Sequence, residues 1–303
     1  MKQFHGMKKK HSFFEGWYLK HRIGTFTISL IPAFHVDNQG QASVSIQIIT
    51  PSYTGSVFFP AEQFLIQPDR FSLQIGKNHF SDTGIAVDLV TEDFYVRGAL
   101  SYGPLTPPQT DLMGPFQYLP FMQCNHGVLS LSHTLCGVLD VNGTPINFSS
   151  GSGYIEKDWG SSFPQSYLWT HGDWLAPSGS PCSVMLSIAH IPIGAAHFTG
   201  CIASVYCENR EYRLATYRRV SILEYTSKRV VLKQGNLRLS ITCLQTDAHP
   251  LAAPVSGTMS RTILESVSGS VRYHFTENGT TLFDTTVPFA SFEIGDVPSE
   301  SEK

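Results

Sequence analysis

The chain is short of charged residues and lacks the motifs on which several common enzyme classes depend. Lys, Arg, Asp and Glu make up 15% of its 303 residues, compared with about 25% in an average globular domain. The sequence contains no glycine-rich phosphate loop and no G-x-S-x-G segment, which excludes the usual nucleotide-binding and α/β-hydrolase sites. A formal net charge of −3 argues against binding through bulk electrostatics, so we expect no nucleic-acid partner.

Cysteine pairs and a signal segment are also missing. The cysteines are scattered and form no C-x-x-C motif: Cys124, Cys136, Cys182, Cys201, Cys207 and Cys243. Six cysteines are too few for a disulfide scaffold in a chain of this length, so we expect reduced thiols. Residues 1–11 are basic and polar, and no apolar segment follows them. The sequence therefore predicts a cytoplasmic protein.

One long stretch lacks charge altogether, since residues 174–207 contain no Asp, Glu, Lys or Arg. A transmembrane helix needs about 20 continuous apolar residues, whereas this stretch is interrupted by Pro177, Pro181 and Pro192. We predict two buried strands at residues 183–191 and 197–207, joined by a Pro-Ile-Gly turn, rather than a membrane span.

What the sequence does contain is alternation of apolar and polar residues with a period of two. Examples are Phe26/Ile28/Leu30, Val44/Ile46/Ile48, Phe71/Leu73/Ile75, Ile85/Val87/Leu89 and Leu239/Ile241/Cys243. This alternation predicts strands, and the frequent turn signals between them are typical of sandwiches and barrels. We expect a helical turn only near residues 60–64. The sequence therefore predicts an all-β fold with few short helices.

Weak self-similarity suggests two modules. A strand ending in Ile-Pro precedes a second strand at residues 27–49 and again at residues 186–206. A duplicated β module explains this recurrence, and chance recurrence in a strand-rich chain explains it equally well. We place a boundary near residue 165, giving modules 1–165 and 166–303. The proline-rich residues 103–120 form a long loop, either a lid or a rigid crossover.

The most unusual segment is GYIEKDWG at residues 153–160, which carries three charges and two aromatic residues. In an extended strand Tyr154, Glu156 and Asp158 share one face, whereas Lys157 and Trp159 share the other with Ile155. Two carboxylates this close in an apolar cavity cannot both ionise without cost, so one of them is a candidate general acid. The alternative is an exposed strand edge with solvated charges.

A second segment, FFEGWY at residues 13–18, places one carboxylate among four aromatic rings. On a strand Glu15 and Trp17 share a face, and Tyr18 points to the other side. One ring can then line a cavity. The alternative is a strand start at which Glu15 pairs with Lys20 or Arg22.

Histidines and cysteines near residues 122–136 raise the question of a metal site. His126 and His133 fall on opposite faces of a continuous strand, and their spacing with Cys124 and Cys136 matches no usual zinc pattern. We therefore predict no metal ion and no cofactor. A polar cavity position for His126 is the favoured interpretation.

At these residues the sequence resembles the tocopherol cyclase family. The matching pieces, in the family's order, are FEGWY (14–18), IGKNHFS (75–81), MGPF (113–116), CNHGV (124–128), GYIEKDWG (153–160) with FP (163–164), and ESVSG (265–269). The resemblance implies two lipocalin-like (calycin-type) antiparallel β-barrel modules. It also implies closure of a chroman ring on a prenylated hydroquinol, an intramolecular lyase reaction. The related carotenoid hydratases look similar at the 153–160 segment.

Both reactions that the resemblance implies begin when an acid protonates a trisubstituted alkene. Glu156 or Asp158 would be the acid, and His126 or the second carboxylate would accept the phenol proton. Aromatic faces would stabilise the cation. With the neighbouring polar residues, the predicted substrate-binding set is Glu15, Trp17, Tyr18, Tyr154, Lys157, Trp159, Phe163 and Trp169. A deep barrel cavity would exclude water, which otherwise captures the cation.

Two further interpretations follow from the same ligand chemistry. The partner is a hydrophobic small molecule, and a lipocalin-like carrier with the same cavity and no turnover is the alternative to a cyclase. Such molecules reside in lipid, and residues 209–238 hold eight Lys/Arg against two Glu. This basic segment either contacts the membrane surface or forms a solvated face.

Overall fold

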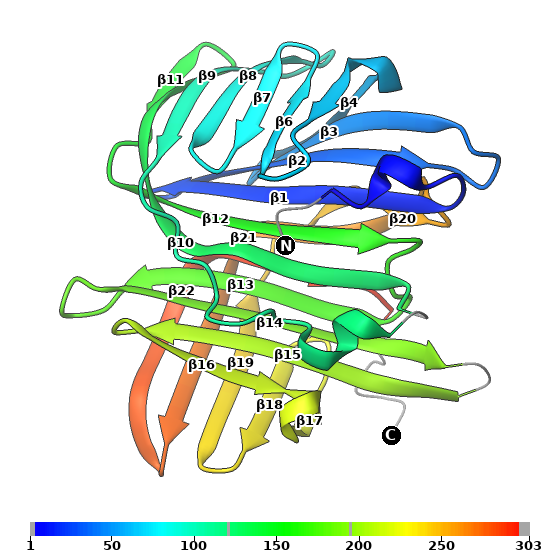
Figure 1. Cartoon of the computed structure of the whole chain (residues 1–303). Coiled ribbons are helices and arrows are strands. Elements are labelled where there is room, and N and C mark those ends of the chain that lie inside the picture. The colour runs from blue at the N-terminus through cyan, green and yellow to red at the C-terminus, as the bar shows by residue number, and fades with distance from the viewer. Residues whose placement is uncertain (1–3, 120–121, 194–195, 297–303) are drawn as a thin grey trace. The chain divides into compact units, whose positions relative to one another are not determined.

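The computed structural model describes residues 4–119, 122–193 and 196–296, and most of them lie in strands (Figure 1). The chain forms two compact units. The first comprises Met1–Asp111, Cys124–Phe163 and Ala252–Arg261, and the second comprises Leu112–Gln123, Pro164–Leu251 and Thr262–Lys303. Each unit is built on one antiparallel sheet with its own apolar core. The prediction of an all-β fold with two antiparallel modules is confirmed.

The sheet of the first unit begins as a meander and then folds back on its first strand. Its strands are β1 (Phe13–Ile23), β2 (Phe26–Val36), β3 (Ala42–Thr50), β4 (Tyr53–Phe59), β5 (Phe64–Ile66), β6 (Ser72–Ile75), β7 (Asn78–Ser81), β8 (Gly84–Val90), β9 (Tyr95–Tyr102), β10 (Cys124–Val141), β11 (Thr144–Asn147) and β12 (Gly151–Gly160). Their order is β4-β3-β2-β1-β12-β10-β9-β8-β7-β6-β5, with β11 paired to β10. The GYIEKDWG segment is therefore a central strand, paired on both edges.

The second sheet repeats this plan. Its strands are β13 (Tyr167–Leu175), β14 (Pro181–Ile193), β15 (Ala196–Cys207), β16 (Arg210–Ala215), β17 (Ser221–Tyr225), β18 (Arg229–Gln234), β19 (Leu237–Gln245), β20 (His249–Val255), β21 (Thr258–Glu277) and β22 (Thr280–Ile294). The order is β16-β15-β14-β13-β22-β21-β19-β18-β17, with β20 paired to β21. The two Ile-Pro pairs lie on β2 and β14, which hold equivalent positions in the two orders, as a duplicated module predicts.

Helical structure in the described residues is limited to short 3₁₀ turns. These are η1 (Gly6–Lys8), η2 (Ala61–Gln63), η3 (Gly114–Tyr118) and η4 (Thr216–Arg218). The second of them lies where the sequence predicts a helical turn. The third belongs to the proline-rich loop, whose residues from Leu112 are part of the second unit. There the Tyr217 hydroxyl donates a 2.9 Å hydrogen bond to the carbonyl of Leu112.

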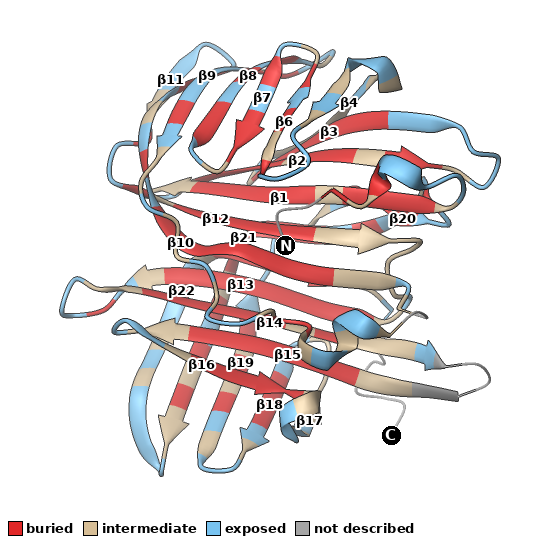
Figure 2. Cartoon of the chain, in the orientation of Figure 1, coloured by how far each residue is buried: buried red, intermediate tan, exposed pale blue. Residues whose placement is uncertain are grey.

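Burial separates the outer strands from the central strands (Figure 2). On β8 the buried residues Ile85, Val87 and Leu89 alternate with exposed ones, as expected for a strand with one solvated face. On β1 and β12, by contrast, successive residues are buried on both faces. The strands that carry the predicted site are therefore shielded from water on both sides.

The uncharged stretch forms the predicted strand pair, but one expectation about it is wrong. The strands β14 and β15 pair along their length, and residues 194–195, which include the glycine of the predicted Pro-Ile-Gly turn, lie outside the described residues. In the described part of the chain, no helix is long and apolar enough to span a membrane. The expectation of reduced thiols is wrong for Cys182 and Cys207, which form a disulfide, whereas the other four cysteines are thiols. The antiparallel register brings these two residues together because they lie opposite each other at the open end of the hairpin.

Candidate active site

The candidate site is built on β12, which lies between β1 and β10. On one side Glu156 is opposite Tyr18 of β1, and on the other side Asp158 is opposite His126 of β10. Directly opposite residues on antiparallel strands share a face of the sheet. The strand pairing therefore gathers these four side chains, from three separate sequence motifs, on one face.

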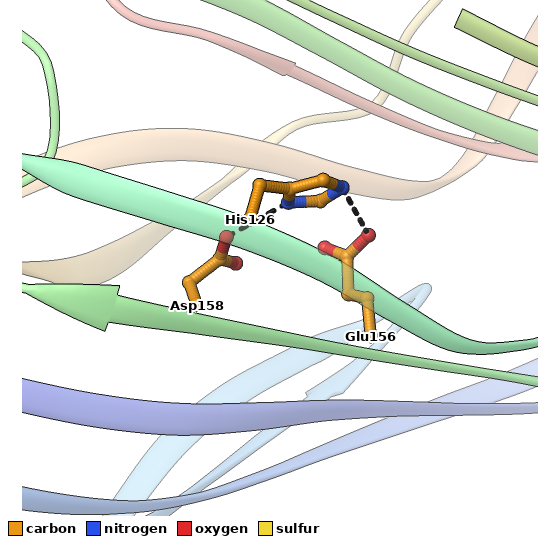
Figure 3. A group of neighbouring side chains, drawn as sticks. All are labelled: His126, Glu156 and Asp158. Carbon is orange, nitrogen blue, oxygen red and sulfur yellow. Dashed lines mark hydrogen bonds and ion pairs between the residues drawn. The ribbon is translucent and has the colours of Figure 1, made fainter. Parts of the chain in front are cut away.

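Three of these side chains form what we call the acid–histidine cluster: His126, Glu156 and Asp158 (Figure 3). The imidazole lies between the carboxylates. Its Nδ1 is 2.8 Å from Asp158 Oδ1, and its Nε2 is 3.5 Å from Glu156 Oε2. The side chains of His126 and Glu156 are 11% and 6% exposed. The sequence alternative of solvated charges on a strand edge is therefore wrong.

The charge state of His126 follows from this arrangement. Burial alone would lower the pKa of the imidazole, but the negative charges of Asp158 and Glu156 outweigh burial and raise the pKa to about 9. The ring is therefore a cation at neutral pH and balances part of the charge of its two neighbours.

Two tyrosines extend the cluster along the same face. The Tyr154 hydroxyl donates a 2.5 Å hydrogen bond to Glu156 Oε2, and the Tyr18 hydroxyl accepts a 3.0 Å bond from the Ser29 hydroxyl. Burial, followed by the charge of Glu156, raises the pKa of Tyr154 well above its usual value. Tyr154 therefore remains a phenol and can act as a hydrogen-bond donor throughout the physiological range.

The opposite face of the same strands carries a separate polar pair. Lys157 Nζ lies 2.8 Å from Glu15 Oε1, and both side chains are almost completely buried. The ammonium also lies over the rings of Trp17 and Trp159, 5.8 Å and 4.7 Å from their centroids. Glu15 and Trp17 lie on one face of β1, as predicted. The alternative prediction, in which Lys20 or Arg22 pairs with Glu15, is wrong because the partner is Lys157.

The position of the core corrects the prediction of which face of β12 lines the barrel interior. The apolar core of the first unit includes Trp17, Leu19 and Ile155, so the core side of the sheet is the Lys157 face. Tyr154, Glu156 and Asp158 point to the other face, because neighbouring residues of a strand alternate. The expectation that the acids line the interior of this barrel is therefore wrong. Apolar residues at odd-numbered positions of β1 and β12 determine the side on which the core forms.

The acid–histidine cluster has the composition of a metal site but not its geometry. Its donor atoms all lie within 4.8 Å of one another. The two carboxylates, however, approach different ring nitrogens, which point away from each other, and the Asp158 contact has the length of a hydrogen bond. A metal ion needs its ligands to converge on one point, with a deprotonated ring nitrogen. The arrangement instead fits a protonated imidazole held by two carboxylates.

The remaining predicted residues are divided between the units. The Phe163 ring packs against Phe14 of β1 in the first unit, with centroids 5.3 Å apart. Trp169 lies on β13 in the second unit, where it is opposite Glu293 and is 5% exposed. Asn125, beside His126, donates from Nδ2 to the carbonyl of Trp159 at 3.3 Å.

Two groups of polar residues were missed by the sequence reasoning. His5 stacks on Trp159 and contacts both Glu15 and Lys157. On the core face, His21 Nε2 lies 2.6 Å from the Tyr102 hydroxyl. Burial, together with nearby His133, lowers the pKa of His21 to about 3, so its ring is neutral. Neither group has a local sequence signal, because each joins residues that are distant in the chain.

Comparison with known families agrees with this architecture. The sequence profile of the family described as tocopherol cyclase-like matches residues 78–296, which is well over half of the chain. The chain belongs to the tocopherol cyclase-like family. No curated protein matches it. The predicted resemblance is thus confirmed at the level of the family.

Solved structures with the same fold cover nearly the whole chain at low identity. CghA bound to Sch210972 aligns with a TM-score of 0.59 and 10% identity, covering 94% of this chain and 88% of that chain. An AttH-type protein from Nitrosomonas europaea aligns with a TM-score of 0.56 and 12% identity, covering 94% and 93%. Kievitone hydratase from Nectria haematococca aligns with a TM-score of 0.52 and 12% identity, covering 93% and 88%. The likeness confirms the lipocalin-like pair of β-barrel modules.

Proposed function

We propose that this member of the tocopherol cyclase-like family is an acid–base catalyst that closes an oxygen-containing ring on a prenylated hydroquinol or a similar hydrophobic substrate. The observation that carries the proposal is the buried acid–histidine cluster, in which a protonated imidazole is held between two carboxylates. In such a cluster the imidazole can exchange its proton with the neighbouring carboxylates, which can then act as general acid and general base. The family membership supports the reaction class.

The proposed reaction is an isomerisation, and the cluster ends each turnover as it began. His126 first gives its proton to the carboxylate of Glu156 or Asp158, and the carboxyl group so formed protonates the less substituted carbon of a trisubstituted alkene, which leaves a tertiary carbocation. A lone pair of the substrate's phenol oxygen then forms the new C–O bond. The phenol proton returns to His126, directly or through the carboxylate. No oxidant, reductant or cofactor is required.

Tyr154 has a positioning role in this scheme. Its hydroxyl donates to Glu156 Oε2, so it holds the carboxylate of Glu156 in place. The Tyr18 ring, opposite Glu156 on β1, offers an aromatic face near the acid. An aromatic face stabilises a nearby cation by about 0.5 to 2 kcal/mol. The low exposure of Glu156 is consistent with the need to keep water from the cation.

Substitution of the two acids tests the proposal. With a prenylated hydroquinol as substrate and chromatographic separation of the isomeric ring product, Glu156→Gln and Asp158→Asn should lower turnover by at least about 100-fold, a typical contribution of general acid–base catalysis. Asp88→Asn, at an exposed carboxylate of the same unit that pairs with Arg97, serves as the matched control. Turnover at the parental rate in both acid variants would contradict the assignment.

The same variants separate a cyclase from a lipocalin-like carrier. A carrier needs the cavity but not the acid, so it would bind the hydroquinol with equal affinity in the parental and variant proteins and would release it unchanged. A cyclase binds it in all three and converts it only in the parent. Binding without conversion by the parental protein would favour the carrier.

Contact with membranes is a further proposal for a protein whose ligand resides in lipid. Within the basic segment, Arg210, Arg213 and Arg229 each pair with a glutamate. These pairs reduce the positive charge available to anionic lipid, which contributes about 1 kcal/mol per exposed Lys or Arg. We expect weak binding to anionic vesicles that disappears as salt is raised. Co-sedimentation without any salt-sensitive fraction would exclude the idea.

A further inference from the structure

The first residues of the described chain enter the core of the first unit without joining its sheet. We call residues Phe4–Lys8 the N-terminal strap. Phe4 is 6% exposed, and its ring lies 5.4 Å from Phe64, 5.5 Å from Phe34 and 6.3 Å from Trp17. The strap then turns back through η1, and Met7 is 73% exposed. A terminal segment therefore places one aromatic ring among aromatic side chains of the core.

The next residue of the strap, His5, contacts the buried ion pair of Glu15 and Lys157. The backbone N–H of His5 donates a 2.7 Å hydrogen bond to Glu15 Oε2. Its ring stacks on Trp159 with centroids 4.6 Å apart and planes at 6°. His5 Nδ1 lies 3.3 Å from Glu15 Oε1 and 3.4 Å from Lys157 Nζ. An aromatic group with one donor and one acceptor thus lies against an ion pair and a tryptophan face.

The pattern of contacts made by the strap is that of a small amphipathic ligand. The Glu15–Lys157 pair is not needed to fill the core, because apolar residues of equal volume usually stabilise a core at least as well as a buried ion pair. The pair is neutral overall, so it accepts an uncharged head group without burying net charge. A hydroxyl group can donate to Glu15, as the N–H of His5 does, and accept from Lys157.

We propose that the first unit contains a second ligand site, walled by Trp17, Phe34, Phe64 and Trp159 and closed by Glu15 and Lys157, for an uncharged phenol or isoprenoid alcohol. The N-terminal strap fills this site when no ligand is bound. Displacing the strap leaves the sheet intact, since its residues belong to no strand. The site is separate from the acid–histidine cluster because Lys157 points to the other face of β12, and it does not depend on the proposed catalysis.

Binding of geraniol to the full chain tests the site. The double variant Phe4→Ala/His5→Ala removes the competing groups, so its Kd for geraniol should be at least about 10-fold lower than that of the parent. Met7→Ala/Lys8→Ala, at exposed positions of the same strap, is the matched control and should bind as the parent does. Adding Lys157→Met to the strap variant should raise the Kd about 10-fold, and the corresponding hydrocarbon without a hydroxyl should bind weakly.

A measurement on the unmodified protein keeps the test independent of how well the variants fold. Geraniol should speed hydrogen exchange of the His5 amide, because the bound alcohol displaces it from Glu15. Equal geraniol affinity in the parental and folded strap variants, equal affinity for the alcohol and the hydrocarbon, or an unchanged His5 exchange rate would each overturn the proposal. Glu156→Gln should leave geraniol binding unchanged, so failure of this site and failure of the catalytic proposal can be distinguished.

Discussion

Titration of His126 tests the electrostatics of the acid–histidine cluster directly. The pKa of about 9 reflects burial, which lowers it, and the stronger opposing effect of Asp158 and Glu156. In an NMR titration of histidine-labelled protein, the ring signal that disappears in His126→Gln should have its midpoint near pH 9. In Asp158→Asn the midpoint should fall, because the largest favourable charge is removed while burial remains.

The same shift predicts how stability depends on pH. The change from 6.5 to about 9 corresponds to about 3 kcal/mol at 1.36 kcal/mol per pKa unit. Because the folded protein holds this proton more tightly than the unfolded chain, the stabilisation is complete below pH 6.5 and is lost as pH rises through 9. Denaturant unfolding between pH 6 and 9.5 should show this loss in the parent and not in His126→Gln. Replacing Trp169 and Trp174 with Phe leaves the tryptophans of the first unit as the fluorescent probe.

The refuting result is a His126 midpoint at or below 6.5. It would mean that burial outweighs the carboxylate charges and that the imidazole ring is neutral at physiological pH. The imidazole could then not supply the proton that the proposed reaction uses. The unfolding experiment gives an independent test. If stability changes with pH in the same way in the parent and in His126→Gln, the reasoning is refuted as well.

Two other predictions concern stability. Either Glu15→Gln or Lys157→Met alone should destabilise the first unit by about 3 to 5 kcal/mol, because each leaves a buried charge without its partner; the double variant should recover most of this loss in thermal unfolding. Cys207→Ser should lower the unfolding free energy by about 3.5 kcal/mol, the chain-entropy value for the sequence separation of 25 between Cys182 and Cys207. Cys136→Ser, at an exposed free thiol, should change it little.

Alternation in the sequence predicts much of the fold because strand periodicity is a local property. It correctly places Tyr154 and Glu156 on one face of a strand and Lys157 on the other, and it separates Trp17 from Tyr18. It cannot say which face meets the core when both are buried, as they are on β12. Because both faces carry aromatic residues, the sequence wrongly predicts that the acidic face lines the barrel interior.

Contacts between distant residues depend on strand register, which the sequence specifies less directly. The Cys182–Cys207 disulfide follows from the register of β14 and β15, in which Ser183 pairs with Tyr206, so that the two cysteines next to this pair meet. Pairing of β10 with β12, which brings His126 to Asp158, gives no comparable signal, because the register shifts twice between the two strands. The approach of His5 to Glu15 depends on an irregular segment that has no periodicity.

Alternation along β12 explains why the nearest lysine in sequence forms its ion pair with Glu15 and not with the acids of the cluster. Lys157 lies between Glu156 and Asp158 in the chain, yet its ammonium is committed to Glu15 on the core face. The charge that balances the acids therefore comes from His126 on the neighbouring strand. Consequently Lys157→Met should alter the stability of the core and the strap site while leaving the His126 titration midpoint near 9. A large shift of that midpoint in Lys157→Met would show that the two faces of the strand are electrostatically one site.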